Sequence, residues 1–263
     1  MTYGQPTFPL EAEMLQRRKP SESEFVAQAR DAQLSERCIH LSAALRERHP
    51  TDASAVEQPR SDLLQVYTQA RGLAGSFAER LAAARWPAGA VAQVRPSGVK
   101  RLDRMVEKYL YSKRALVVPL DMLGAKVVVD SVWDMYDVAS QVQSVFPVVG
   151  YRDRVVRPQS SGYRDLQFVV NAGTEAQPHY AELKVMHRLI DELDGYEHKL
   201  YEIRRELQAK ETERQTEQQA TSEELFGRAL LSPIEQLVLD TLETASADLF
   251  DRAWQMILEA EHG

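Results

Sequence analysis

Two acidic residues stand beside apolar segments that are predicted to be strands. Asp121 comes directly before the run MLGAKVVV, so its carboxylate is expected at the edge of a sheet. Glu182 lies within HYAELKVM, where strand alternation turns its two neighbours to the opposite face. Two carboxylates from neighbouring strands can hold Mg²⁺ between the protein and substrate phosphates. Taken alone, each acid is equally typical of a capped or ion-paired structural residue.

Basic residues form two clusters along the chain. Three- and four-residue spacings place one set on one side of a helix predicted over residues 99–113, and a second set precedes a Gly-Tyr-Arg turn. The first set is Lys100, Arg101, Arg104 and Lys108, and the second is Arg152, Arg154 and Arg157. Such clusters can surround a triphosphate, although an ordinary solvated face also explains any single member.

The segment SSGYRDLQFVV joins a small-residue turn to a predicted strand. Gly162 permits a tight turn, and Tyr163 emerging from it would have one free ring face suited to stacking on a purine base. Arg164 can address a phosphate or a base edge. The alternative is a tyrosine packed beneath a loop.

Composition limits the class of protein. With 263 residues and 44% hydrophobic residues, the chain is long enough and apolar enough for a proper core. The net charge of −7 argues against a protein that coats nucleic acid, but residues 95–165 hold 12 Lys and Arg against 8 Asp and Glu, which suits a phosphate-bearing small ligand. Cys38 is the only cysteine, which excludes a disulfide framework and favours a reducing cytoplasm. The apolar runs are too short to span a bilayer, so we expect no membrane insertion.

The pattern along the chain predicts an α+β fold, a mixed β-sheet flanked by helices with helical N- and C-terminal extensions. We expect an arm at 1–20, a helical region at 21–90, a mixed domain at 91–210, and a linker with two amphipathic helices at 211–263. Strands are predicted near 125–130, 148–156, 166–170 and 180–185, and helices over 131–146 and from about 187 past 205. Ser232, Pro233 and Glu235 form a helix start signal.

Three motifs in this order resemble the RelA/SpoT-type alarmone synthetase domain, over about residues 94–205. They are LDMLGAKVVVD at 120–130, RPQSSGYRDLQ at 157–167 and AELKV at 181–185. The resemblance implies a nucleotidyltransferase-like fold that moves the β,γ-pyrophosphate of ATP to a ribose 3′-hydroxyl, with Mg²⁺ as cofactor. No His-Asp pair is adjacent in the sequence, so the hydrolase half of the family's long members is expected to be absent.

The resemblance also implies roles for single residues. Lys100 matches the family's lysine for ATP phosphates, Asp121 its Mg²⁺ aspartate, and Tyr163 its base-stacking tyrosine. Glu182 matches the second acid, which holds metal or helps to activate the attacking hydroxyl. The remaining candidates for nucleotide binding are Arg104, Lys126, Arg154, Arg164 and Lys184.

Four positions depart from the family pattern. Gly98 stands where the family has an arginine two residues before the lysine, and Lys126 replaces another arginine, keeping its charge without the bidentate fork. Gln167 replaces a histidine, and Lys184 replaces the glutamine of Glu-x-Gln. Arg95 or Arg101 could reach in from a neighbouring position to make good the arginine that Gly98 lacks. Both activity and acceptor therefore stay open.

Two classes of function compete at this stage. One is a pyrophosphokinase that acts on ATP and a purine nucleotide, or, as a toxin, on the 3′ end of tRNA; the local basic excess favours the small nucleotide. The other is a catalytically silent fold that binds a nucleotide or a protein partner, with the helical extensions as surfaces for that partner or for a second copy. The enzyme hypothesis expects Tyr163 to be partly exposed above one cleft beside Asp121, on which five cations converge: Lys100, Arg104, Lys126, Arg154 and Arg164.

Overall fold

The computed structural model describes residues 22–111, 116–220 and 231–261, so the arm expected at 1–20 lies outside the described residues. The helices are α1 (Glu22–Arg48), α2 (Leu63–Ala83), α3 (Leu102–Tyr111), α4 (Val132–Val145), α5 (Arg188–Ala220) and α6 (Pro233–Glu261). The strands are β1 (Val91–Val99), β2 (Leu123–Val129), β3 (Val148–Asp153), β4 (Leu166–Asn171) and β5 (Tyr180–His187). Two short 3₁₀ turns, η1 (Ala53–Ala55) and η2 (Leu120–Met122), complete the described elements.

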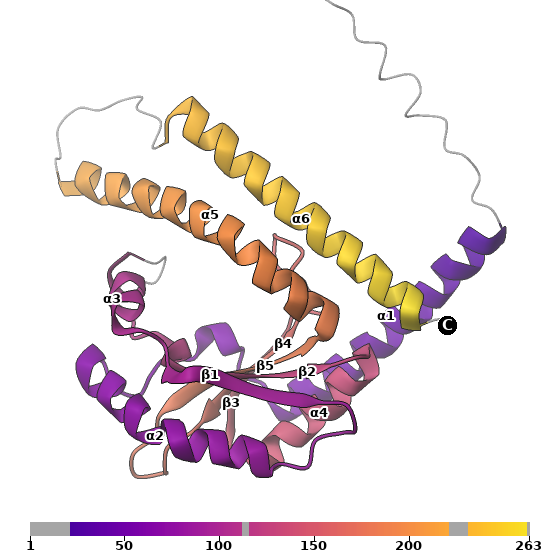
Figure 1. The fold of residues 1–263 in the computed structure, drawn as a ribbon, viewed down its shortest axis with the longest axis horizontal. Coiled ribbons are helices and arrows are strands. Elements are labelled where there is room, and N and C mark those ends of the chain that lie inside the picture. The colour runs from indigo at the N-terminus through magenta and orange to yellow at the C-terminus, as the bar shows by residue number, and fades with distance from the viewer. Residues whose placement is uncertain (1–21, 112–115, 221–230, 262–263) are drawn as a thin grey trace, which may run out of the picture.

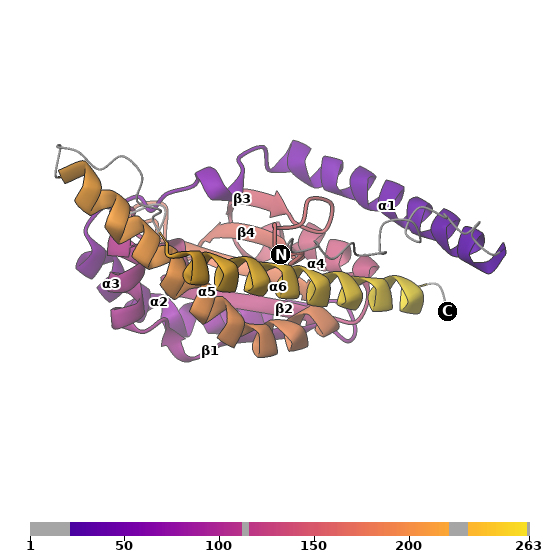
Figure 2. The same cartoon turned by 90° about the horizontal axis from the view of Figure 1, so that it is seen from above.

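The strands form one five-stranded sheet in the order β1-β2-β5-β4-β3. Only β2 and β5 run parallel, and the other three pairs are antiparallel. Helices α5 and α6 lie on one side of this sheet and α2 and α4 on the other (Figure 1), and the view from above shows α6 lying alongside α5 (Figure 2). The prediction of an α+β fold with a mixed sheet flanked by helices is confirmed.

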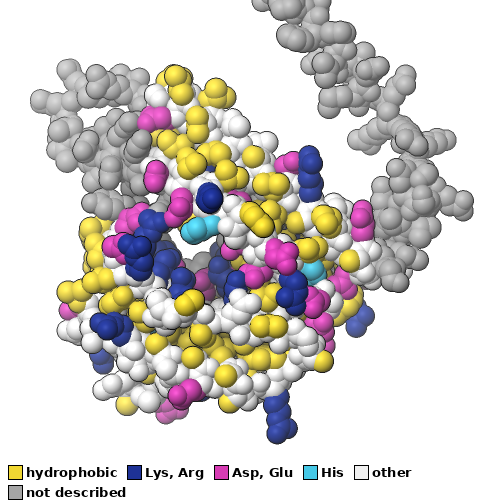
Figure 3. Space-filling model, in the orientation of Figure 1, with side chains coloured by type: hydrophobic (Ala, Val, Ile, Leu, Met, Phe, Trp, Pro, Cys, Tyr) yellow, Lys and Arg dark blue, Asp and Glu magenta, His cyan; other side chains and the backbone are white. Residues whose placement is uncertain are grey.

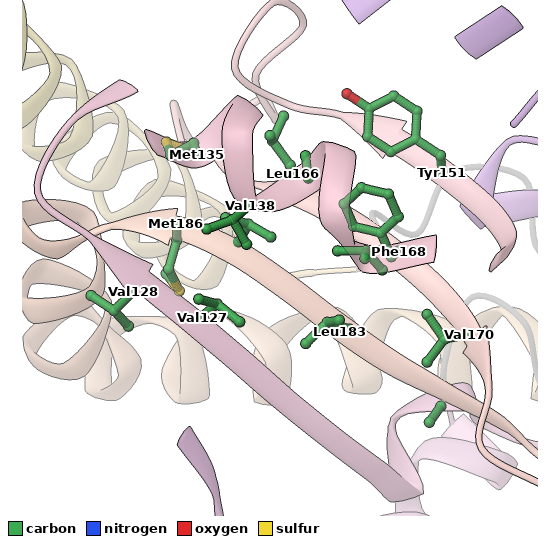
Figure 4. Close-up of a cluster of buried hydrophobic side chains, with 14 of the residues drawn as sticks. Val127, Val128, Met135, Val138, Tyr151, Leu166, Phe168, Val170, Leu183 and Met186 are labelled. Atoms are coloured by element: carbon green, nitrogen blue, oxygen red, sulfur yellow. The ribbon is translucent and has the colours of Figure 1, made fainter. Parts of the chain in front are cut away.

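Strand alternation gives the sheet one apolar and one polar face. Phe168 and Leu183 are register partners on β4 and β5, both fully buried, and they belong to the same buried cluster as Val138 of α4 (Figure 4). Burying side chains of this size contributes about 1.5–3 kcal/mol each. The residues that alternate with them along each strand point to the other face of the sheet, and some of these are charged. Burial of the apolar face therefore stabilises the sheet, and the polar face is available for a functional site.

Two predicted helix starts are confirmed by their caps. Ser131 accepts a hydrogen bond from the Asp134 backbone N–H at 3.0 Å, at the start of α4. Before α6, Ser232 and Glu235 exchange hydrogen bonds at 2.9 and 3.2 Å, as in a capping box.

The sequence prediction was wrong about the C-terminal region. Residues 233–261 form one helix where two were expected, and α5 continues to Ala220, past the boundary expected at 210. The apolar pattern of α6 is interrupted near Ser246 because α6 lies against α5 there. The Ser246 side chain is buried, and its hydroxyl donates to Glu197 of α5 at 2.7 Å. Among the described residues, no helix is long and apolar enough to cross a bilayer.

Strand β1 was also missed. The helix expected over residues 99–113 begins only at Leu102, because residues 91–99 pair with β2. The pairing continues past the end of the strand, where the Lys100 backbone N–H donates to the Met122 carbonyl at 2.8 Å. Lys100 is therefore a strand-end residue next to η2, and not the helix residue that the sequence suggested.

Candidate functional site

A single carboxylate held by two lysines lies at the edge of the sheet. Asp121, in η2, accepts hydrogen bonds from Lys100 Nζ at 2.7 Å and from Lys108 Nζ of α3 at 2.9 Å, each on a different carboxylate oxygen. Lys100 reaches it because the β1–η2 backbone contact brings the two segments together. Lys108 reaches it from the last turn of α3. Lys108 was noted on a basic helix face but was not chosen as a site residue.

The charges of this cluster set its protonation. Burial would raise the pKa of Asp121, but Lys108 and Lys100 outweigh it and hold that pKa well below its usual range. Burial lowers the pKa of Lys100, which Asp121 opposes and Lys108 and Arg95 reinforce. Asp121 is therefore a carboxylate at any physiological pH, which is the form that binds a metal ion.

Glu182 lies on the polar face of β5, beside the strand that follows Asp121. Gly124, three residues after Asp121, is the register partner of Glu182. Gln167 of β4 donates to one Glu182 oxygen at 2.6 Å, and Lys184 Nζ lies 4.0 Å from the other. The two departures from the family pattern at 167 and 184 thus flank Glu182 directly.

Three of these polar residues form a row across the sheet. Lys126, Lys184 and Gln167 are register partners on β2, β5 and β4, so their side chains share one face. Helix α5 lies opposite this row and supplies acids: Asp191 pairs with Lys126, and Glu202 pairs with Arg104 of α3. Figure 3 shows a hollow bordered by Lys and Arg side chains between the sheet and α5. Lys126 and Arg104 are thus each paired with a carboxylate of α5.

Arg154, expected to bind nucleotide, is held in a buried ion pair. It is 5% exposed, and its Nε and Nη2 donate to the two oxygens of Asp165, at 2.5 and 2.6 Å. Such a bidentate pair uses the geometry by which arginine otherwise binds phosphate. A buried carboxylate therefore occupies the guanidinium that was expected to bind phosphate.

Tyr163 is buried as well, contrary to the expectation of a partly exposed ring. It is 6% exposed, and its hydroxyl donates to Asp165 Oδ2 at 3.0 Å. Phe250 of α6 packs edge-on against it, with ring centroids 5.5 Å apart and an angle of 89° between the ring planes. The alternative raised from the sequence, a tyrosine packed beneath a loop, describes this arrangement better, except that helix α6 provides the cover.

Helix α6 covers the rest of the Gly-Tyr-Arg turn. Arg164 donates to the Val155 carbonyl at 2.6 Å, and its guanidinium lies 4.6 Å from the ring centre of Trp254. Gly162 has a φ of 78°, and a Cβ there would lie 3.0 Å from Phe250 Cβ. Glycine is thus required twice, by the turn and by the close approach of α6. Arg164 does not converge on Asp121 as expected, since it packs against α6.

The arginine that Gly98 lacks has a structural explanation. Gly98 has a φ of 73°, where side chains are rare, and a Cβ there would lie 3.0 Å from Ala74 Cβ of α2. Of the two arginines considered as replacements, Arg101 pairs with Asp103 and its side chain is 77% exposed. Arg95 instead lies over Gly124 in the site.

No family model and no curated protein matches the chain. Among solved structures, it is similar to small alarmone synthetase 2 from Bacillus subtilis, at 16% identity over 76% of this chain and 97% of that one, with a TM-score of 0.42. It is similar to small alarmone synthetase 1 from Bacillus subtilis bound to its product pppGpp, at 16% identity over 73% and 92%, with a TM-score of 0.40. A third match is a chain of the complex between the type VI effector Tas1 and its immunity protein, at 16% identity over 72% and 96%, with a TM-score of 0.38.

The first two of these structures are synthetases of the kind whose motifs the chain resembles. At this identity and these TM-scores, the likeness says nothing of activity, substrate or partner. The fold and the site together define an α+β protein with a mixed sheet, a lysine-bound aspartate just before β2, and a neighbouring glutamate on the polar face of β5.

Proposed function

We propose that the chain is a Mg²⁺-dependent pyrophosphokinase that transfers the β,γ-pyrophosphate of ATP to the 3′-hydroxyl of a purine nucleotide. The observation that carries the proposal is the Asp121 cluster: an ionised carboxylate between Lys100 and Lys108 at the sheet edge, with Glu182 on the adjacent strand. Such a transfer needs carboxylate oxygens to hold the metal ion, cations to bind the phosphates and a group to accept a proton. These three kinds of group occur here together.

The donor set fits Mg²⁺, which binds proteins through one or two carboxylates and completes its shell with water and substrate phosphates. Asp121 would be the first ligand and Glu182 the second. The metal, when bound, neutralises charge on the transferred phosphates. In the structure, Lys100 and Lys108 neutralise Asp121. With a metal on that carboxylate, both ammonium groups are free to donate to phosphate oxygens.

The bonds formed and broken in the proposed transfer, and its proton, can all be accounted for. The acceptor 3′-oxygen attacks the β-phosphorus of ATP, the bond from that phosphorus to the α,β-bridging oxygen breaks, and AMP leaves with the oxygen. Glu182 takes the hydroxyl proton. Gln167 donates to one of its oxygens at 2.6 Å, which fixes the carboxylate while the other oxygen, 4.0 Å from Lys184, faces the site.

The second candidate, a catalytically silent binder of a nucleotide or a protein, is favoured by one observation. Phe250 packs against the ring of Tyr163, so the surface proposed for the acceptor base is covered. A silent member of the fold needs no open acceptor site. It would still bind ATP through the Asp121 cluster, or a protein partner through its helices.

Label transfer separates these candidates. The protein is incubated with γ-labelled ATP and Mg²⁺, and separately with GDP, GTP, AMP, ADP, ATP or tRNA. We expect label on one purine nucleotide, at least a 100-fold lower rate for Asp121→Asn, and an unchanged rate for the matched surface control Arg252→Ala, whose residue pairs with Asp248 on α6. Label on tRNA alone would identify tRNA as the acceptor and would support the toxin hypothesis. ATP binding without transfer to any acceptor would establish the silent binder.

A further inference from the structure

Arg95 approaches the site from the edge strand. Val94 of β1 pairs with Ala125 of β2, and the register shifts between Val94 and Val99, which marks a bulge. Bulges bend a strand and redirect its side chains. The guanidinium of Arg95 consequently lies over Gly124, where a Cβ would stand 3.8 Å from Nε and 3.9 Å from Nη2.

Arg95 differs from the other cations of the site in its hydrogen bonds. Lys100 and Lys108 share Asp121, and Lys126 pairs with Asp191. In the part of the chain that the structure describes, the buried Arg95 Nε has no hydrogen-bond partner. Buried donors are normally satisfied, so one without a partner in a polar site indicates a ligand atom that is bound there.

The charge around Asp121 indicates what kind of ligand this is. Lys100 and Lys108 both donate to Asp121, at 2.7 and 2.9 Å, and the guanidinium of Arg95 lies over Gly124, three residues after that carboxylate. Three cations thus surround one carboxylate, and like charges at such distances repel one another unless an anion lies between them. A ligand with several negative charges satisfies this arrangement better than a single carboxylate does.

We propose that Arg95 binds the polyphosphate tail of the nucleotide donor and supplies the guanidinium that position 98 cannot carry. This inference rests on the proposed function, because it assigns a residue to the same donor site. The arginine fork presents two parallel N–H groups to phosphate oxygens, which lysine cannot do. Arg95 would therefore add directional binding to a cluster that otherwise holds only lysines.

The test measures equilibrium binding to the full chain with Mg²⁺, by calorimetry, for three probes: a non-hydrolysable ATP analogue, AMP and inorganic tripolyphosphate. For Arg95→Ala we expect the Kd to rise about 10- to 100-fold for the ATP analogue and for tripolyphosphate, with AMP unchanged. Arg95→Lys should restore part of the affinity, because it returns the charge without the fork. Arg252→Ala, a surface arginine on α6, should match the wild type.

A melting curve separates a binding role from a structural one. Removal of a donor without a protein partner should leave the melting temperature of Arg95→Ala close to that of the wild type, whereas a structural arginine would lower it. Equal affinities of Arg95→Ala and Arg252→Ala for tripolyphosphate would overturn the inference. If the wild type binds tripolyphosphate but not the ATP analogue, the proposed function fails while the role of Arg95 is still measured. If it binds neither, both fail.

Discussion

Substitution of Tyr163 by alanine or phenylalanine tests whether this residue belongs to the core or to a nucleotide site. Its ring contacts Phe250, and its hydroxyl donates to Asp165 at 3.0 Å in a buried setting. We expect both substitutions to lower stability. A stacking residue would behave differently, because its removal would weaken nucleotide binding and leave the fold intact.

The two expected magnitudes follow from what each substitution removes. Alanine leaves a cavity beneath α6, which costs about 3–5 kcal/mol for a large buried ring. Phenylalanine keeps the ring and removes a hydrogen bond to a charged acceptor, which is worth about 1.5–3 kcal/mol. Asp165 keeps both bonds from Arg154, so the lower end of that range is expected for phenylalanine. For a chain of this size, the alanine variant should melt about 6–20 °C below the wild type.

Thermal and urea unfolding of both variants, with ATP and GDP affinities measured on the same samples, supply the readout. Tyr196→Ala is the matched control, since Tyr196 on α5 is 82% exposed and its loss should change stability by less than about 0.5 kcal/mol. The core interpretation is refuted if Tyr163→Ala melts with the control and loses about 1–3 kcal/mol of nucleotide binding, the usual worth of a stacked base.

Three further outcomes are expected. Glu182→Gln should abolish transfer with little change in melting temperature, because Gln167 can still contact the new amide; wild-type turnover would remove Glu182 from the reaction. His179 is buried, which lowers its pKa to about 4, so protonation favours the unfolded chain, and stability should fall as the pH drops from about 6.5 to 4. A His179→Asn variant should show less of this fall, as measured by urea unfolding at pH 7.5 and 4.5. Burial raises the pKa of Cys38 to about 11, so its thiol should react on the order of 100-fold more slowly in the folded protein than in urea at pH 8, and equal rates would contradict its burial.

Local sequence rules were enough for several elements. The apolar runs of β2, β4 and β5 and the caps at Ser131 and Ser232 depend on residues close in sequence, and all were predicted. Strand β1 was missed because VAQVRPSGV contains Pro96 and Gly98, which usually end elements. Proline is tolerated on an edge strand, and β1 is an edge strand only because β2 pairs with it. That pairing cannot be read from the segment itself.

In the site, too, features that depend on residues close in sequence were predictable and those that depend on distant residues were not. Asp121 and Glu182 were proposed because both acids stand beside apolar strand segments. The burial of Tyr163 was raised only as an alternative, since it depends on Phe250, a residue on a helix far along the chain. Arg154 carried the right charge for phosphate, but its partner Asp165 was not considered, and a buried ion pair leaves no trace in composition.

The cover formed by α6 has a consequence for synthesis of the chain on the ribosome. Glu261 at the end of α6 accepts a hydrogen bond from the Val132 backbone N–H, the first residue of α4, and these two residues are 129 positions apart. At about 5–20 residues per second, Val132 leaves the ribosome roughly 6–26 s before its partner. During this interval the ring of Tyr163 and the guanidinium of Arg164 lack the helix that later shields them. The nascent sheet thus exposes an aromatic and charged surface that α6 covers in the finished protein, and this is the stage at which a chaperone would bind it.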